Sequence, residues 1–123
     1  MANEITITTG MQRQSATVLL RRHDFPAQRK LYDQSGVGCD DREHSVGTSE
    51  ESITFTDIAT NGFVLMVNLD PTNYVQWGFS TTVYGGRMKA SQMAGPFFME
   101  PGATLFVKAN TAACRVRIIH YEA

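Results

Sequence analysis

One stretch decides the fold class: Gly62-Phe63-Val64-Leu65-Met66-Val67-Asn68-Leu69, then Asp70-Pro71-Thr72-Asn73, then Tyr74-Val75-Gln76-Trp77-Gly78-Phe79. The first run is apolar, too short for a capped helix, and bounded on both sides by turn-forming residues. Apolar side chains occupy both of its faces, which predicts a strand covered on both sides at the centre of a β-sheet. A tight connection and a second, aromatic-rich strand follow.

Length and composition narrow the class of protein. The chain has 123 residues, of which 42% are hydrophobic and 19% charged, which favours one folded domain over residues 1–123. No apolar run approaches the roughly 18 residues of a membrane-spanning helix, and the N-terminus has no signal-peptide pattern. The net charge of −1 argues against wholesale nucleic-acid binding. We expect a soluble protein made in the cytoplasm, without a membrane or nucleic-acid partner.

Short runs of strand-like alternation recur along the rest of the chain. They cover residues 5–9, 15–20, 53–56, 74–79, 93–99, 104–108 and 114–121, with a helix as the alternative for residues 15–20. With the 63–69 run, this makes about eight strands at a spacing of roughly 8 to 12 residues, which predicts an all-β sandwich or barrel. Residues 24–48 lack such a pattern, so we expect a long loop excursion there with a partner-binding role.

Turn-forming residues give more local expectations. Asn61-Gly62 is typical of a tight hairpin. Gly95-Pro96 places the 93–99 strand at an edge or a bulge, because proline donates no hydrogen bond to a ladder. Glu100-Pro101-Gly102-Ala103 has proline and glycine where a type II turn requires them. In the last strand, Cys114, Val116 and Ile118 should point inward and Arg115 and Arg117 outward.

Charge is unevenly distributed. Residues 13–30 carry five cations against one acid, and residues 33–57 carry seven acids against one cation. These two blocks can dock one copy onto another, or they can be two solvated faces. We expect partner contacts in and beside the 24–48 excursion, where cations and aromatic residues combine: Arg21, Arg22, Phe25, Arg29, Lys30 and Tyr32.

Motifs for enzymatic chemistry are missing from the sequence. The serines near His44 have no nucleophile elbow, adjacent acids such as Asp40-Asp41 point to opposite sides of an extended chain, and Gly85-Gly86 lacks the lysine of a phosphate loop. Ligand-type residues are present in His23, Cys39, Asp40, Asp41, Glu43 and His44, but a second half-site to complete four metal ligands is not. We expect no catalytic residue, no metal and no cofactor, and we expect Cys39 and Cys114 to be free thiols.

Aromatic residues suggest a different kind of site. If Tyr74 and Trp77 reach the surface, they can stack on a sugar ring or a base, with Asn68 or Asn73 as hydrogen-bonding neighbours. The alternative is that these rings serve core and subunit packing.

Several sequence segments, in their order along the chain, resemble those of small β-rich structural proteins of tailed bacteriophages. These segments are Gly47-Thr48-Ser49-Glu50-Glu51 with Asp57-Ile58, then Asn68 through Gly78, Glu100 through Leu105, and Lys108 through Ala113. The likeness covers roughly Gly47 to the C-terminus, and the residues before Gly47 match no pattern.

This resemblance implies a virion component without catalytic residues, folded as an antiparallel β-sandwich of jelly-roll-like type. Within that class we expect a capsid decoration (cement) protein, a homotrimer on the capsid surface that contacts the major capsid protein. An N-terminal arm over residues 1–10 can add to a neighbour's sheet. A tail, neck or head-fibre component and a carbohydrate-binding module are the alternatives.

Overall fold

The structure is a computed structural model that describes residues 5–14 and 22–123, apart from the side chains of residues 12–14 and 22–24. The chain divides into two compact units, residues 1–35 and residues 36–123. The expected all-β class is confirmed, because the described residues form ten strands arranged in antiparallel sheets. None of the described residues belongs to a helix that could cross a lipid bilayer.

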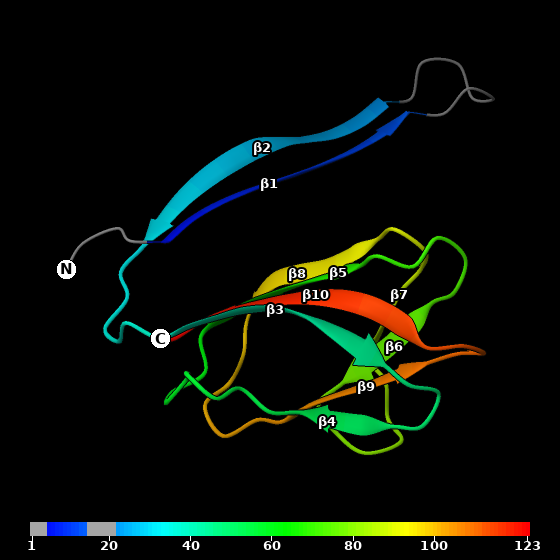
Figure 1. Ribbon diagram of the computed structural model, residues 1–123. Helices are drawn as coiled ribbons and strands as arrows, with labels where there is room; N and C mark the ends of the chain where they lie inside the picture. Colours follow the sequence, from blue (N-terminus) through cyan, green and yellow to red (C-terminus); the bar gives the residue numbers. More distant parts are fainter. Residues whose placement is uncertain (1–4, 15–21) are drawn as a thin grey trace. The chain divides into compact units, whose positions relative to one another are not determined.

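The first unit contains a two-stranded antiparallel hairpin of β1 (Ile5–Gln14) and β2 (Arg22–Tyr32) (Figure 1). A bulge between Thr9 and Met11 interrupts their register. Residues 5–9 therefore pair within their own chain and do not form a free arm, which corrects that part of the expectation. Residues 1–4 of the expected arm lie outside the described residues. The strand expected over residues 15–20 lies outside the described residues.

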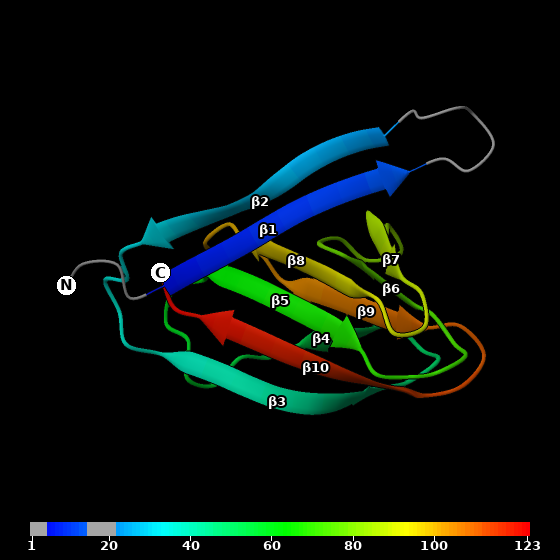
Figure 2. The same ribbon diagram turned by 90° about the horizontal axis from the view of Figure 1, so that it is seen from above.

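The second unit is a sandwich of two four-stranded sheets, with strand orders β3-β10-β5-β8 and β4-β9-β6-β7 (Figure 2). The strands are β3 (Cys39–Val46), β4 (Glu51–Ile53), β5 (Phe63–Asn68), β6 (Val75–Gly78), β7 (Gly86–Met88), β8 (Met93–Phe98), β9 (Leu105–Ala109) and β10 (Cys114–Tyr121). Each connection between consecutive strands from β3 to β10 crosses from one sheet to the other, except the β6–β7 connection, which stays within one sheet. This arrangement agrees with the expected jelly-roll-like sandwich.

Two domain-level expectations need correction. The sandwich occupies residues 36–123 and not the whole chain, because β1 and β2 pair only with each other among the described strands. The expected loop over residues 24–48 contains most of β2 and all of β3. The polar sequence of β3 is compatible with a strand because β3 lies at a sheet edge, where Arg115 and Arg117 of β10 pair with its outward acids Glu43 and Asp41.

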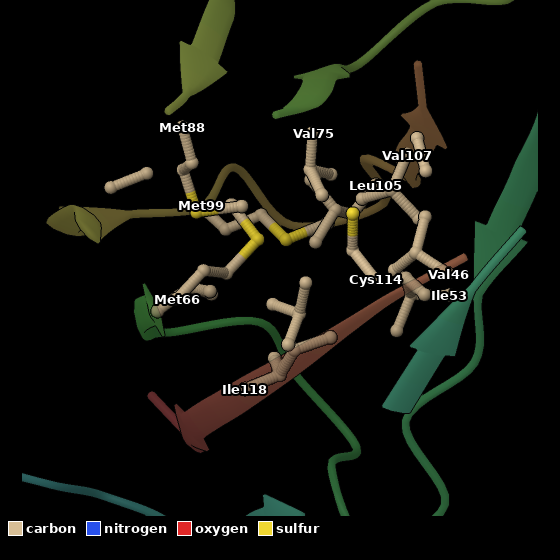
Figure 3. Close-up of a cluster of buried hydrophobic side chains, with 14 residues drawn as sticks. Val46, Ile53, Met66, Val75, Met88, Met99, Leu105, Val107, Cys114 and Ile118 are labelled. Atoms are coloured by element: carbon tan, nitrogen blue, oxygen red, sulfur yellow. The ribbon is translucent and has the colours of Figure 1, made fainter. Parts of the chain in front are cut away.

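The central strand β5 lies between β10 and β8, as its apolar run predicts. Val64, Met66 and Asn68 point into the core and are fully buried, while the opposite face of β5 is half-buried. Figure 3 shows how the side chains of Met66, Met88 and Met99 meet Val75, Leu105 and Ile118 between the sheets. Burial of such side chains contributes about 1.5–3 kcal/mol each, so this core is what holds the sandwich together.

Asn68 fixes the connection that follows the central strand. Its buried side-chain amide donates hydrogen bonds to the carbonyls of Asn73, Met88 and Lys89, at 2.9, 3.2 and 3.1 Å. Its Oδ1 accepts the Asp70 backbone N–H at 3.0 Å. These bonds hold the connection from β5 to β6, which crosses from one sheet to the other.

Several local expectations are confirmed. The strand β8 is at a sheet edge and carries a register irregularity opposite Val64 and Met66, as Gly95-Pro96 predicts. The Ala103 N–H donates to the Glu100 carbonyl at 3.0 Å and Gly102 has φ +83°, which are the features of a type II turn. The strand β10 has the predicted bounds, with alternating buried and exposed residues.

The hairpin expected at Asn61-Gly62 does not form, because β4 pairs with β9 and β5 pairs with β10 and β8. Tertiary contacts occupy both residues instead. The Asn61 side chain donates to the carbonyls of Glu100 and Ala103, each at 3.1 Å, and the Gly62 N–H donates to Nε2 of the buried His120 at 3.0 Å.

Both cysteines are free thiols. Cys39 is exposed on β3, and Cys114 is buried on β10. The pKa of each thiol is raised, first by burial and then by nearby aspartates. A raised pKa keeps a thiol protonated and unreactive at neutral pH.

Candidate binding site

One side of the sandwich contains a hollow lined almost entirely by apolar residues, which we call the aromatic pocket. It has a volume of about 610 Å³ and is lined by Trp77, Phe79, Gly95, Phe97, Phe98, Glu100 and Ala103. Trp77 comes from β6, Phe97 and Phe98 come from β8, and Glu100 and Ala103 belong to the type II turn after β8. The pocket therefore lies where the edge strand β8 of one sheet meets β6 of the other.

Three aromatic rings form the wall of the pocket. Trp77 and Phe97 are stacked, with centroids 5.2 Å apart and an interplanar angle of 4°. Phe79 meets both rings edge-on, at 6.0 Å from Trp77 and 5.8 Å from Phe97. Offset-stacked and edge-to-face pairs are the arrangements that aromatic rings prefer, so these rings hold each other in place.

Two glycines make this arrangement sterically feasible. Gly86 on β7 is the cross-strand partner of Trp77, and a Cβ atom at Gly86 would overlap the indole ring. Gly95 has φ +98°, and a Cβ atom there would overlap the Val64 carbonyl oxygen. Substitution at either position must displace the ring or the strand that it touches.

The chemistry of the pocket suits an apolar side chain. Glu100 is the only charged side chain among its lining residues, and the Trp77 indole N–H is the only other polar side-chain group there. Phe79 and Phe98, with exposed fractions of 43% and 53%, are apolar surface still open to contact. Apolar pockets of this kind receive a small apolar ligand or the anchoring side chain of a protein partner. A sugar needs several hydrogen-bonding groups, which this lining does not offer.

The residues expected to bind a sugar are not brought together. Tyr74 does not line the pocket; the Arg87 guanidinium lies over its ring, 4.0 Å from the centroid. Asn68 is buried in its structural role, and Asn73 Oδ1 accepts a hydrogen bond from the Thr111 hydroxyl at 2.9 Å. Of the four, only Trp77 belongs to the pocket.

The expected partner-binding residues lie on the hairpin, so far as they are described. Arg21 and the side chain of Arg22 lie outside the described residues. Cross-strand partners share a face of a sheet, and β2 pairs Phe25 with Met11, Lys30 with Ile7 and Tyr32 with Ile5. Arg29, which pairs with Thr8, is on the opposite face. The predicted set is therefore split between the two faces of the hairpin.

The acidic block is largely neutralised within the sandwich. Asp41 accepts two hydrogen bonds from the Arg117 guanidinium, at 3.0 and 2.8 Å, and these lower the pKa of its carboxyl. Glu43 pairs with Arg115. Glu50 Oε1 accepts the Tyr84 hydroxyl and the Thr82 N–H, each at 2.6 Å, and the Tyr84 bond is the main cause of its lowered pKa. These intramolecular partners argue against the acidic block as the docking site of the basic block.

Inward-pointing polar residues close the side of the sandwich opposite the aromatic pocket. We call this the polar edge; it consists of Asp40, Arg42 and His44 on β3, with Glu51 and Thr54 across from them. His44 Nε2 is 2.7 Å from Glu51 Oε1, and Arg42 Nη2 donates to the Thr54 carbonyl at 2.6 Å. Asp40 Oδ2 and Arg42 Nε are 3.8 Å apart. Charged side chains that point inward at an edge strand discourage it from pairing with another chain.

The candidate metal ligands on β3 alternate between its two faces. Asp40 and His44 point inward, whereas Cys39, Asp41 and Glu43 point outward. Among the described residues, no group of three or more potential ligands is close enough to hold a metal ion. The side chain of His23 lies outside the described residues.

Sequence reasoning missed most of the pocket. It selected Trp77, but Phe97, Phe98 and Glu100 lie about twenty residues further on, and Phe97 stacks on Trp77 only because β8 and β6 face each other. The one local signal was the aromatic pair directly after Gly95-Pro96, a pattern that marks an irregular edge strand with large side chains. The role of His120 in holding Gly62 had no signal in the sequence.

Comparisons with known proteins leave the fold and the pocket as the basis for any functional argument. No family model matches this chain, and neither a curated protein nor a solved structure matches it significantly.

Proposed function

We propose that this protein is a non-enzymatic structural component of a phage virion, a capsid decoration (cement) protein that binds the major capsid protein and stabilises the head. The observation that carries the proposal is the architecture: a small all-β sandwich accompanied by a separate compact hairpin unit in the same chain. Sandwiches of two four-stranded sheets recur in viral capsid domains, and an additional hairpin gives such a domain a second surface for neighbours.

Exposed apolar residues support a role in assembly. On β8, Met93 and Phe98 are exposed, and they pair with Val67 and Phe63 on the outer face of the same sheet. Apolar groups that cluster on a surface mark interaction sites. In a capsid, many copies of such a contact, each of modest strength, stabilise the shell through multivalency.

Copy number tests this proposal. We expect purified virions, analysed by quantitative mass spectrometry, to contain the protein in numbers comparable with the major capsid protein, and we expect the purified protein to bind expanded capsids. A handful of copies per particle would place it instead in the tail, the neck or a head fibre. Its absence from particles would overturn the virion role altogether.

A carbohydrate-binding module is the second candidate, since sandwiches of this kind also occur in lectins. The observation that favours it is the stack of aromatic rings at Trp77. A glycan-array signal that Trp77→Ala abolishes in a folded protein would support it. The mainly apolar lining, with Glu100 as its one charged side chain, argues for a protein ligand instead.

A further inference from the structure

One face of the hairpin carries exposed apolar side chains. On the face that Ile5 shares with Tyr32, Ile5 is buried, but Met11 and Phe25 have exposed fractions of 74% and 47%. A two-stranded hairpin buries little apolar surface by itself and is marginal in isolation. The Met11–Phe25 pair is therefore apolar surface that calls for a covering partner.

Two charged side chains of opposite sign, one in each unit, complement each other. Lys30, on the same hairpin face as Phe25, forms no ion pair with any residue that the structure describes. The same is true of the Glu100 carboxylate at the rim of the aromatic pocket, whereas Asp41, Glu43 and Glu51 have partners. The Phe25 ring, with the Lys30 cation on the same face, thus complements an aromatic pocket that has the Glu100 carboxylate at its rim.

The edge strand beside the pocket favours capture of a side chain over addition of a strand. Pro96 lies in β8 and has no N–H to donate, so a strand added at this edge would lack a ladder hydrogen bond there. An incoming segment is therefore held mainly by the side chain that it inserts.

We propose that the aromatic pocket of one copy binds Phe25 of a second copy, with Lys30 of that copy beside Glu100. Because the hairpin and the pocket are different surfaces, the contact is heterologous, and it closes into a ring when each copy repeats it. A ring of three would agree with the trimer expected for a decoration protein, but the contact does not depend on the virion role.

Sedimentation velocity on the full chain, over a range of concentrations, tests this contact. We expect the wild type to form a closed oligomer that dissociates on dilution. Phe25→Ala, Lys30→Glu and Glu100→Lys should each raise the apparent dissociation constant at least tenfold. The double variant with Lys30→Glu and Glu100→Lys should recover most of that loss, because it restores the ion pair with its charges reversed.

Arg29 provides the matched control, because it carries the same charge as Lys30 one residue away on the opposite face of the hairpin. Arg29→Glu should leave the oligomer unchanged. Circular dichroism and the urea midpoint show whether each variant is folded. A wild-type protein that stays monomeric at every concentration would overturn the proposal, as would an equal effect of Arg29→Glu and Lys30→Glu or a double variant without recovery. None of these results bears on copy number in virions, so the two proposals fail separately.

Discussion

Beside β3 the space between the two sheets is closed by Asp40, Arg42 and His44, whereas beside β8 it is closed by Trp77, Phe79 and Phe97. The two sides belong to the same pair of sheets, and each includes an edge strand, yet their chemistry is opposite. Inward charges make an edge strand a poor template for pairing with another chain. Aromatic rings around a hollow leave apolar surface for a ligand. The sandwich therefore has one side protected against contact and one side suited to it.

The largest expected effect comes from removing the central ring of the aromatic pocket. Trp77→Ala eliminates the stack on Phe97 and the edge contact of Phe79. Because Trp77 is half-buried, we expect a loss of about 3 kcal/mol in the free energy of unfolding, the lower end of the range for large aromatic deletions. Urea unfolding with an unchanged m-value measures this loss.

Tyr74→Ala is the control for that experiment, because Tyr74 is an aromatic residue near Trp77 that lies outside the pocket and contacts Arg87 instead. Loss of a cation–π contact at the surface should cost less than about 1 kcal/mol. Equal losses for the two variants would show that the rings of the pocket are not a cooperative unit.

The contrast between the two sides also explains which parts of the molecule the sequence could predict. The strand β10 was predicted within its bounds because Cys114, Val116 and Ile118 alternate with two arginines, and β8 was placed at an edge because of its proline. These signals are local.

The polar edge strand could not be predicted in the same way. Asp40, Asp41, Arg42 and Glu43 have the composition of a loop, and they form a strand only because β10 supplies paired arginines and hydrogen-bond partners. Tertiary context therefore overrides intrinsic preference. For a related reason, only part of the pocket could be predicted: Trp77 stood out in the sequence, but its stacking partner Phe97 comes from the other sheet.

A smaller effect on the free energy of unfolding, which depends on pH, is expected from His120 on β10. His120 is fully buried, its Nε2 accepts the Gly62 N–H, and Phe55 packs edge-on against its ring at 4.2 Å. Burial lowers the pKa of His120, and the nearby Asp40 carboxylate opposes that shift only in part. The folded state therefore favours the neutral imidazole, and protonation of Nε2 would break the bond to Gly62.

The sign of the pH dependence follows from linkage. An unfolded histidine titrates near pH 6.5, so the unfolded state binds a proton first as the pH falls. The contribution of His120 is present above that pH and is lost as the pH falls toward its folded pKa, by up to about 1.4 kcal/mol per pH unit. Urea unfolding between pH 7.5 and pH 5 measures the slope. His120→Gln should have a flatter slope, and an unchanged slope would contradict this assignment.

The smallest expected change in stability comes from making the polar edge resemble the aromatic side. Asp40→Val combined with Arg42→Leu removes a pair in which Asp40 Oδ2 and Arg42 Nε lack hydrogen-bond partners among the described residues. Replacement of such a pair by apolar residues is often neutral or stabilising, so we expect the free energy of unfolding to stay within about 1 kcal/mol or to rise. Self-association should increase nevertheless, because the edge strand β3 loses the inward charges that oppose pairing.

Light scattering and urea unfolding on the same samples separate the two effects of this double variant. Arg42→Leu alone is the informative comparison, because it leaves Asp40 without its cation and should be less stable than the double variant. If the double variant unfolds as readily as Arg42→Leu and stays as soluble as the wild type, the inward charges stabilise the fold and do not protect β3 against pairing with other chains. The two sides of the sandwich would then differ in packing chemistry but not in their openness to other chains.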